Sequence, residues 1–267
     1  ALQQIVGSAQ RAVDFLSRAL LHGHPWFHRH SKPNLTLLLF TSHNSDMEPR
    51  QSARESVAAC SRELAGHGLL IGTAGNVSTC FEGPTGTELA ITATGGELAR
   101  TTFAEVTIVD LQGRILEGDL EPTSELHLHL DTANERAGAL VHTHSPIATA
   151  LSLVMDELPC VHYQQLVLGG AINVAPFGVF GSEELARNVR QALAGKQAAI
   201  MANHGTVTWG ADLGYAMQNA LLLEWAAEIY WRARAIGEPR ALTDEQQNAV
   251  VEAAIARGYG STKKVTS

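Results

Sequence analysis

The stretch Pro122-Thr-Ser-Glu-Leu-His-Leu-His-Leu-Asp131, followed closely by Val141-His-Thr-His-Ser-Pro146, decides how this chain folds. The first part has the pattern of a helix that begins at Ser124, a favourable N-cap, and carries Glu125 in its first turn, where the helix dipole favours a carboxylate. The buried stripe of this helix consists of apolar residues three or four positions apart: Leu126, Leu130 and Ala133. Glu125 and His129 are then neighbours on an adjoining face.

The second part has the pattern of a strand with two histidines on one face. Alternate side chains of a strand share a face, so His142 and His144 point the same way, about 6–7 Å apart. Taken alone, such a pair is more often exposed or hydrogen-bonded, and a glutamate in a first turn is more often only a partner of the helix dipole. A third histidine, His204 in Asn203-His-Gly205, favours the joint interpretation. Three imidazoles near Glu125 indicate a catalytic metal with a general base.

Composition and charge limit the classes of partner. The chain has 267 residues, of which 45% are hydrophobic and 17% charged, as in a soluble globular protein. Its net charge of -8 gives no basic surface for nucleic acid or for an anionic membrane. No apolar run is long enough for a transmembrane helix. The three cysteines form neither a disulfide framework nor a Cys-x-x-Cys pair, which favours a reducing, cytoplasmic location: Cys60, Cys80 and Cys160.

The order of patterns predicts one layered α/β domain. Helices are expected at 49–65, 124–136, 146–155, 182–194 and 211–236, and strands at 69–78 and 88–92 and in a hairpin over 107–116. Consecutive strands with short turns indicate a mostly antiparallel sheet, which the helices cover on both faces as a three-layer α/β/α arrangement. Residues 1–46 hold five of the twelve histidines and differ in pattern. They are interpreted as an N-terminal extension or a non-native upstream segment, before a catalytic domain at 47–267.

Three turns combine small or hydroxyl residues with backbone N–H groups that are free to point outward. They are Gly75-Asn76, Thr94-Gly95 and Thr123-Ser124. Each is an ordinary turn or helix cap when it is taken alone. If the fold brings them together, they form an anion cradle of backbone amides and hydroxyls that needs no lysine.

Five short motifs stand in a fixed order along the chain: Gly72-Thr-Ala-Gly-Asn-Val-Ser78, Ile91-Thr-Ala-Thr-Gly95, Pro122-Thr-Ser-Glu125, Val141-His-Thr-His144 and Asn203-His-Gly205. Each is weak evidence by itself, but their order and spacing together are specific. With them the chain resembles the class II aldolase/adducin family over about residues 50–258. Within that family it is most similar to the L-fuculose-1-phosphate aldolases.

The resemblance implies a role for each matching position. Zinc would be held by His142, His144 and His204, and Glu125 would be the acid/base that also approaches the metal. The substrate phosphate would lie at Gly75, Asn76, Thr94, Gly95, Thr123 and Ser124, with Thr123 in place of a frequent serine. Tyr163 would reach a neighbouring subunit's site in a homotetramer of fourfold symmetry. Tyr259 would correspond to a C-terminal aromatic residue that closes over the substrate, and His129 would support the site.

The implied activity is zinc-dependent cleavage of a ketose 1-phosphate, such as L-fuculose 1-phosphate, to dihydroxyacetone phosphate and an aldehyde through an enediolate. No lysine lies near the motifs, so a Schiff base has no candidate nucleophile. A pentulose-phosphate 4-epimerase would need an aspartate after Cys160, where the chain has Val161-His-Tyr163. A methylthioribulose-phosphate dehydratase shares the metal site and stays an alternative. A non-catalytic adducin-like scaffold would need neither the three histidines nor Glu125.

Overall fold

The computed structural model describes residues 48–257, so the expectations for residues 1–46 and for Tyr259 lie outside the described part of the chain. The strands are β1 (Asn76–Gly83), β2 (Gly86–Thr92), β3 (Val106–Asp110), β4 (Ile115–Glu117), β5 (Ala139–Thr143), β6 (Glu157–Leu158), β7 (Ile172–Ala175), β8 (Ala198–Met201) and β9 (Gly205–Gly210). They form one sheet in the order β4-β3-β2-β1-β5-β9-β8-β7-β6. Neighbours are antiparallel except for β7 and β8.

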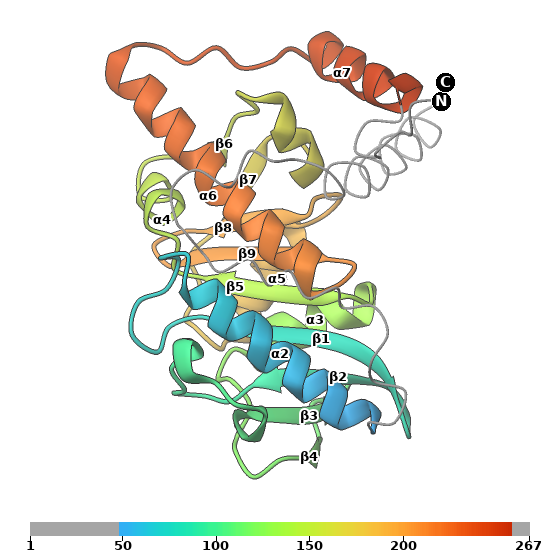
Figure 1. Ribbon diagram of the computed structural model, residues 1–267. Helices are drawn as coiled ribbons and strands as arrows, with labels where there is room; N and C mark the ends of the chain where they lie inside the picture. Colours follow the sequence, from blue (N-terminus) through green and yellow to red (C-terminus); the bar gives the residue numbers. More distant parts are fainter. Residues whose placement is uncertain (1–47, 258–267) are drawn as a thin grey trace.

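Helices cover both faces of this sheet (Figure 1), which confirms the predicted three-layer α/β/α arrangement. On one face lie α2 (Pro49–Ala65), α4 (Pro146–Leu151) and α6 (Leu213–Ile236), and on the other lie α3 (Leu126–Glu135) and α5 (Glu183–Ala192). Three short 3-10 helices, η2 (Leu98–Arg100), η3 (Phe103–Glu105) and η4 (Tyr163–Leu168), and a last helix, α7 (Asp244–Arg257), complete the described part. No helix within residues 48–257 is long and apolar enough to cross a membrane.

Strand β5 shows how the sequence pattern fixes the layers. Its Ala139 and Val141 belong to the core under α2 and α6, while Leu140 belongs to the core under α3 and α5. Because side chains alternate along a strand, His142 shares the face of Leu140, beneath α3. The strand itself thus turns His142 toward the helix that carries Glu125 at its start.

Two local predictions were wrong. Residues 69–75 are a loop and not a strand, and the strand begins at Asn76, where pairing with β5 starts; pairing with β2 follows from Ser78. The N-cap of α3 is Glu125 and not Ser124, because Thr123–Glu125 form a turn in which the N–H of Leu126 donates to the carbonyl of Thr123. The residues involved have no strong local preference for one structure. Strand pairing therefore decides where β1 begins, and the turn at Thr123 decides where α3 begins.

A buried ion pair joins α2 to the sheet. Glu88 on β2 is fully buried and accepts from Nε and Nη2 of Arg50 at 2.7 and 2.8 Å. The backbone N–H and the hydroxyl of Thr85 also donate to the Glu88 carboxylate. The hydrogen bonds from Arg50 lower the pKa of Glu88 from 4.5 to about 2, against the opposing effect of burial. The pair therefore holds the start of the described chain against the central sheet.

We expect Glu88→Gln to lower the free energy of unfolding at pH 7 by about 1.5–3 kcal/mol, because it weakens charge-assisted hydrogen bonds inside the protein. The folded-state pKa lies below the unfolded value, so this stabilisation is complete above about pH 4.5 and is lost as the pH falls through about 2. Urea denaturation at pH 7 and pH 3 measures both effects, with Glu97→Gln, in an exposed pair with Arg100, as the control. An equal loss in the two variants would contradict the prediction.

Candidate metal centre and active site

Three segments that are distant in the sequence bring the predicted metal ligands together. His142 lies in β5 and His144 just after it, Glu125 is the N-cap of α3, and His204 lies in the turn between β8 and β9. Strand β5 pairs with both β1 and β9, so the turn before β9 lies beside the end of β5. The sheet order, and not sequence proximity, assembles the site.

The turn that carries His204 depends on two special residues. Asn203 has a φ of 58°, a left-handed conformation that asparagine tolerates better than most residues with a side chain. Its N–H donates to the hydroxyl of Ser152 at 3.1 Å. A Cβ on Gly205 would lie 2.3 Å from the carbonyl oxygen of Thr143, so only glycine allows β9 to approach β5 this closely. The residues on either side of His204 in the Asn-His-Gly motif thus determine where His204 lies.

The ligand atoms converge on one point. The nitrogens that His142, His144 and His204 present all lie within 4.8 Å of one another. Nε2 of His142 lies 3.1 Å from Nε2 of His144 and 3.1 Å from Oε2 of Glu125. Nε2 of His204 lies 3.5 Å from Oε1 of Glu125. Ligands about 2.0–2.1 Å from a tetrahedral zinc ion lie roughly 3.3 Å apart, so this spacing fits such an ion.

Hydrogen bonding fixes which nitrogen of His142 faces the cluster. Nδ1 lies 2.9 Å from the carbonyl oxygen of Thr206, which can only accept, so Nδ1 carries the proton in the neutral ring. Nε2 then presents a lone pair to Glu125 and His144. A carbonyl that orients a ligating imidazole in this way is typical of metal sites. This role of Thr206 could not be predicted from the sequence, because every residue type has the same backbone carbonyl.

Glu125 is almost fully buried and keeps a negative charge. Burial raises its pKa, but the neighbouring His142 side chain and the hydrogen bond from Asn76 outweigh burial and hold the pKa well below its usual range. Oε2 accepts from Nδ2 of Asn76 at 3.0 Å, whereas Oε1 is buried without a hydrogen-bond partner. An unpaired buried carboxylate oxygen beside imidazole lone pairs is unfavourable unless a cation or a proton joins them.

These observations together show that the residues fit a divalent metal. Burial lowers the pKa of His144 to about 4 and lowers that of His204, so both are neutral and able to ligate near pH 7. The three imidazoles offer nitrogen ligands with positions left open, as in catalytic and not structural zinc sites. Oε1 of Glu125, which has no hydrogen-bond partner, lies beside these nitrogens and could approach the same ion.

The three predicted anion-binding turns come together beside this cluster. Thr94 donates its N–H to the carbonyl of Glu121, and Ala93 pairs with Pro122, so the second turn adjoins the third. Nδ2 of Asn76 donates to Oγ1 of Thr123 at 3.1 Å, which joins the first turn to the third. The side chain of Asn76 is buried and used internally. Exposed groups of these turns come from three other residues: Thr94, Gly95 and Ser124.

Tyr163 is placed differently from the other predicted site residues. It begins η4, is 42% exposed, and stacks on His162 with ring centroids 4.6 Å apart. Within residues 48–257, no hydrogen bond or ring contact joins it to Glu125 or to the three histidines. Lys196, the lysine within this range, donates to the carbonyls of Gly169 and Ala171, which leaves a Schiff-base mechanism without a nucleophile.

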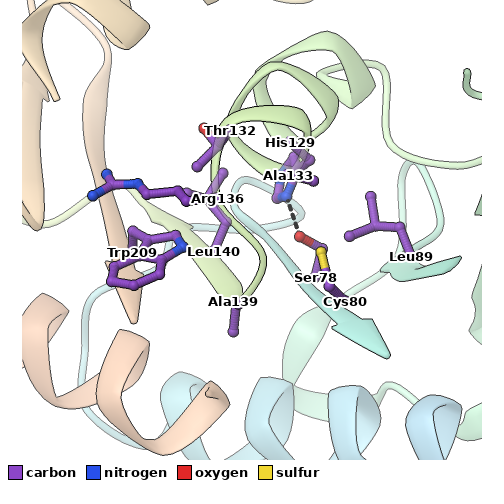
Figure 2. Close-up of a pocket in the computed structure, with 11 residues that line it drawn as sticks. Ser78, Cys80, Leu89, His129, Thr132, Ala133, Arg136, Ala139, Leu140 and Trp209 are labelled. Atoms are coloured by element: carbon purple, nitrogen blue, oxygen red, sulfur yellow. Dashed lines mark hydrogen bonds between the residues drawn. The ribbon is translucent and has the colours of Figure 1, made fainter. Parts of the chain in front are cut away.

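Two cavities within residues 48–257 contain none of the three clustered histidines. A pocket of about 650 Å³ lies between α2, β1 and the start of α6, on the opposite face of the sheet, and none of the predicted site residues lines it. The second cavity, shown in Figure 2, has a volume of about 10 Å³ and lies behind Ser78 and His129. That volume holds one water molecule at most.

Comparison with known proteins identifies the family to which the chain belongs. The family model of the class II aldolase and adducin N-terminal domain matches residues 55–231. A 5-deoxy-D-ribulose 1-phosphate aldolase of Bacillus thuringiensis is 34% identical over 79% of this chain and 98% of its own length. A 5-methylthioribulose-1-phosphate/5-deoxyribulose-1-phosphate aldolase of Rhodospirillum rubrum is 33% identical over 82% and 97%. A solved L-fuculose 1-phosphate aldolase is 30% identical over 76% and 95%, with a TM-score of 0.71. The chain therefore belongs to the class II aldolase and adducin family.

Proposed function

We propose that the protein is a zinc-dependent aldolase that cleaves a ketose 1-phosphate to dihydroxyacetone phosphate and an aldehyde. The observation that carries this proposal is the buried Glu125 carboxylate, whose Oε1 lacks a hydrogen-bond partner and lies 3.5 Å from Nε2 of His204, while Oε2 lies 3.1 Å from Nε2 of His142. A base held beside a Lewis-acid site is what abstraction of a proton next to a carbonyl requires. The relatives described above are aldolases of ketose 1-phosphates by name, which supports the same reaction.

The residues divide the work between binding and proton transfer. A metal held by His142, His144 and His204 would supply a Lewis acid that stabilises negative charge on the oxygens of the substrate. In the cleavage direction the hydroxyl proton is lost as the carbon–carbon bond breaks, and the electron pair remains on the dihydroxyacetone phosphate half as an enediolate. Glu125, which is ionised at rest, takes up a proton from solvent and delivers it to that carbon, and in the reverse direction the carboxylate removes this proton. Oε1 is the atom in position to do so, since Oε2 is held by Asn76.

The phosphate would bind at the three joined turns. They offer the exposed hydroxyls of Thr94 and Ser124 and the exposed backbone of Gly95, next to Gly75 and Thr123. Backbone N–H groups in turns bind phosphate without a charged side chain. This suits a chain whose net charge of -8 gives no general attraction for anions.

Apolar side chains beside the site favour an aldehyde with an apolar end. Phe177, Val179 and Phe180 are exposed in the loop before α5. This loop lies against the start of α3, because a Cβ on Gly181 would lie 2.5 Å from the carbonyl oxygen of Ser124. The names of two relatives include 5-deoxy and 5-methylthio sugars, which end in apolar groups. We propose a deoxy or alkylthio ketose 1-phosphate as the substrate class.

We further propose a homotetramer in which Tyr163 serves the site of a neighbouring subunit. The side chain is exposed, and within the described residues no hydrogen bond joins it to the cluster of its own chain, which agrees with such a role. Its task would be to pass the hydroxyl proton to solvent during cleavage, giving up its own phenol proton as it accepts that of the substrate, and to donate a proton to the aldehyde oxygen in the reverse reaction.

Removal of a metal ligand should separate folding from metal binding. We expect the purified protein to carry about one zinc ion per chain and His144→Ala to lose it while remaining folded, because His144 lies at a strand end and is only partly buried. Elemental analysis and circular dichroism measure this, and exposed His67→Ala is the matched control. Full activity of wild-type protein after chelation would contradict a metal-dependent mechanism.

Neutralising the proposed base should abolish turnover but not binding. Glu125→Gln is expected to keep zinc and an analogue of the ketose phosphate, and to lower kcat by about 10²–10⁴-fold, the usual contribution of a general acid or base. Steady-state kinetics and calorimetric titration provide the measurements. The exposed Glu121→Gln is the control. Turnover of Glu125→Gln within tenfold of wild type would show that another group removes the proton.

Proton exchange on dihydroxyacetone phosphate should identify the reaction class. We expect wild type to exchange one carbon-bound proton with deuterated solvent in the absence of aldehyde, since Glu125 acts on this half alone. Tyr163→Phe should retain the exchange while cleavage slows by about 10²-fold or more. NMR follows the exchange, and the cleavage assay compares 5-deoxyribulose 1-phosphate with ribulose 1-phosphate. A dehydratase or an epimerase would show no exchange with dihydroxyacetone phosphate, and a scaffold would act on none of these compounds.

A further inference from the structure

We propose that Ser78 and His129 act as positioning residues: they fix the orientation of the Asn76 side-chain amide, which in turn holds one oxygen of Glu125. This inference rests on the proposed function, because it concerns the group that moves the proton. It assigns a role in the reaction to two buried side chains that touch neither the three histidines nor the exposed parts of the three turns. The role follows from a single line of hydrogen bonds.

The line runs from a strand through a helix and back to the site. Oγ of Ser78 lies 2.6 Å from Nδ1 of His129, and Nε2 of His129 lies 2.6 Å from Oδ1 of Asn76. Nδ2 of Asn76 then donates to Oε2 of Glu125 at 3.0 Å and to Oγ1 of Thr123 at 3.1 Å. Every member of the line is at least nine-tenths buried, so water does not compete for these bonds.

The secondary structure explains why these residues meet. Asn76 and Ser78 are alternate residues of β1 and share its face toward α3, whereas Val77 between them packs in the core under α2. His129 lies one turn after Glu125, so its ring projects from α3 over both side chains. Figure 2 shows the contact between Ser78 and His129 at the wall of the small cavity.

Only one direction of the hydrogen bonds satisfies all the groups. Burial lowers the pKa of His129 to about 3, so its ring is neutral and has one donor and one acceptor nitrogen. The ionised Glu125 can only accept, which turns the amino group of Asn76 toward it and leaves Oδ1 for His129. Nε2 of His129 must then donate, and Nδ1 accepts from the hydroxyl of Ser78. The neutral imidazole is thus the donor that keeps Oδ1 away from the carboxylate.

Loss of that donor would release the amide. Oδ1 of Asn76 would be left buried without a partner, and rotation of the amide by 180° would place it against Oε2 of Glu125, where two acceptors repel. Glu125 would then lose the bond that holds Oε2 and leaves Oε1 directed at the histidines. We infer that the line of bonds selects which carboxylate oxygen is available for proton transfer.

The first test measures the tautomer of His129 directly and does not use activity. Protein labelled with ¹⁵N-histidine should show His129 as a neutral ring with the proton on Nε2 and protected from exchange with solvent. The resonance is assigned from its absence in His129→Gln. A ring with the proton on Nδ1, or one that averages between the two tautomers, would overturn the proposal whatever the enzyme catalyses.

The second test measures the exchange rate of dihydroxyacetone phosphate protons in matched variants. His129→Leu removes the donor and should lower kcat by about 10–100-fold with zinc content retained and with KM little changed. His129→Gln, whose amide can donate to Oδ1, should restore most of the rate. Thr132→Val, also on α3 and beside the same cavity, should exchange at the wild-type rate.

A smaller substitution tests the same line of hydrogen bonds with less risk that the variant fails to fold. Ser78→Ala removes one hydroxyl and should slow exchange by about fivefold, the loss expected for one neutral hydrogen bond. If wild type shows no exchange, the proposed function fails and the NMR measurement alone decides the orientation of Asn76. If wild type exchanges and folded, zinc-loaded His129→Leu equals it, the positioning role is refuted while the aldolase stands.

Discussion

The structure depends on one unfavourable contact: a buried carboxylate that faces imidazole lone pairs. Glu125 has an oxygen without a partner, 3.5 Å from His204, inside a protein that satisfies nearly every other buried polar side-chain group of the described chain. Such an arrangement is stable only if a cation or a proton is shared among the groups. The rest of the site can be understood as support for that arrangement: a carbonyl that orients His142, a glycine that admits His204, and an amide that holds Glu125.

The sheet gives this support its rigidity. Strands β1, β5 and β9 are neighbours in the middle of the sheet, and each contributes to the site at the same end. Asn76 pairs directly with His142 across β1 and β5, so a group that holds the base and a group that would hold the metal are fixed by one backbone ladder. Sites built on strands keep their geometry more closely than sites built on loops alone. The turns for the phosphate lie at the edge of this rigid frame and are joined to it through Thr123.

Buried polar side chains fix the positions of segments next to the site through directional hydrogen bonds, which buried apolar side chains cannot form. The hydroxyls of Thr143, Ser145 and Thr206 bond to one another beneath the histidines, and Glu224 accepts from the N–H groups of Ile147 and Ala148 at the start of α4. Each of these bonds fixes a segment next to a ligand, since α4 begins two residues after His144. A network that is fully satisfied specifies one arrangement, which an apolar core of the same size would specify less sharply.

The sequence by itself determined most of the helices, several strands and the chemistry of the ligands, but it did not predict β6, β7 or α7. Hydrophobic spacing predicted α2 at its observed bounds, and the residue types of His142, His144, His204 and Glu125 indicated a metal with a base. Spacing could not place the loop before Asn76 or the true N-cap of α3, because strand pairing and the turn at Thr123 decided them. Only the tertiary structure decided which nitrogen and which oxygen face the site. That choice rests on contacts such as those from Thr206 to His142 and from His129 to Asn76, which join segments more than 50 residues apart and leave no local pattern.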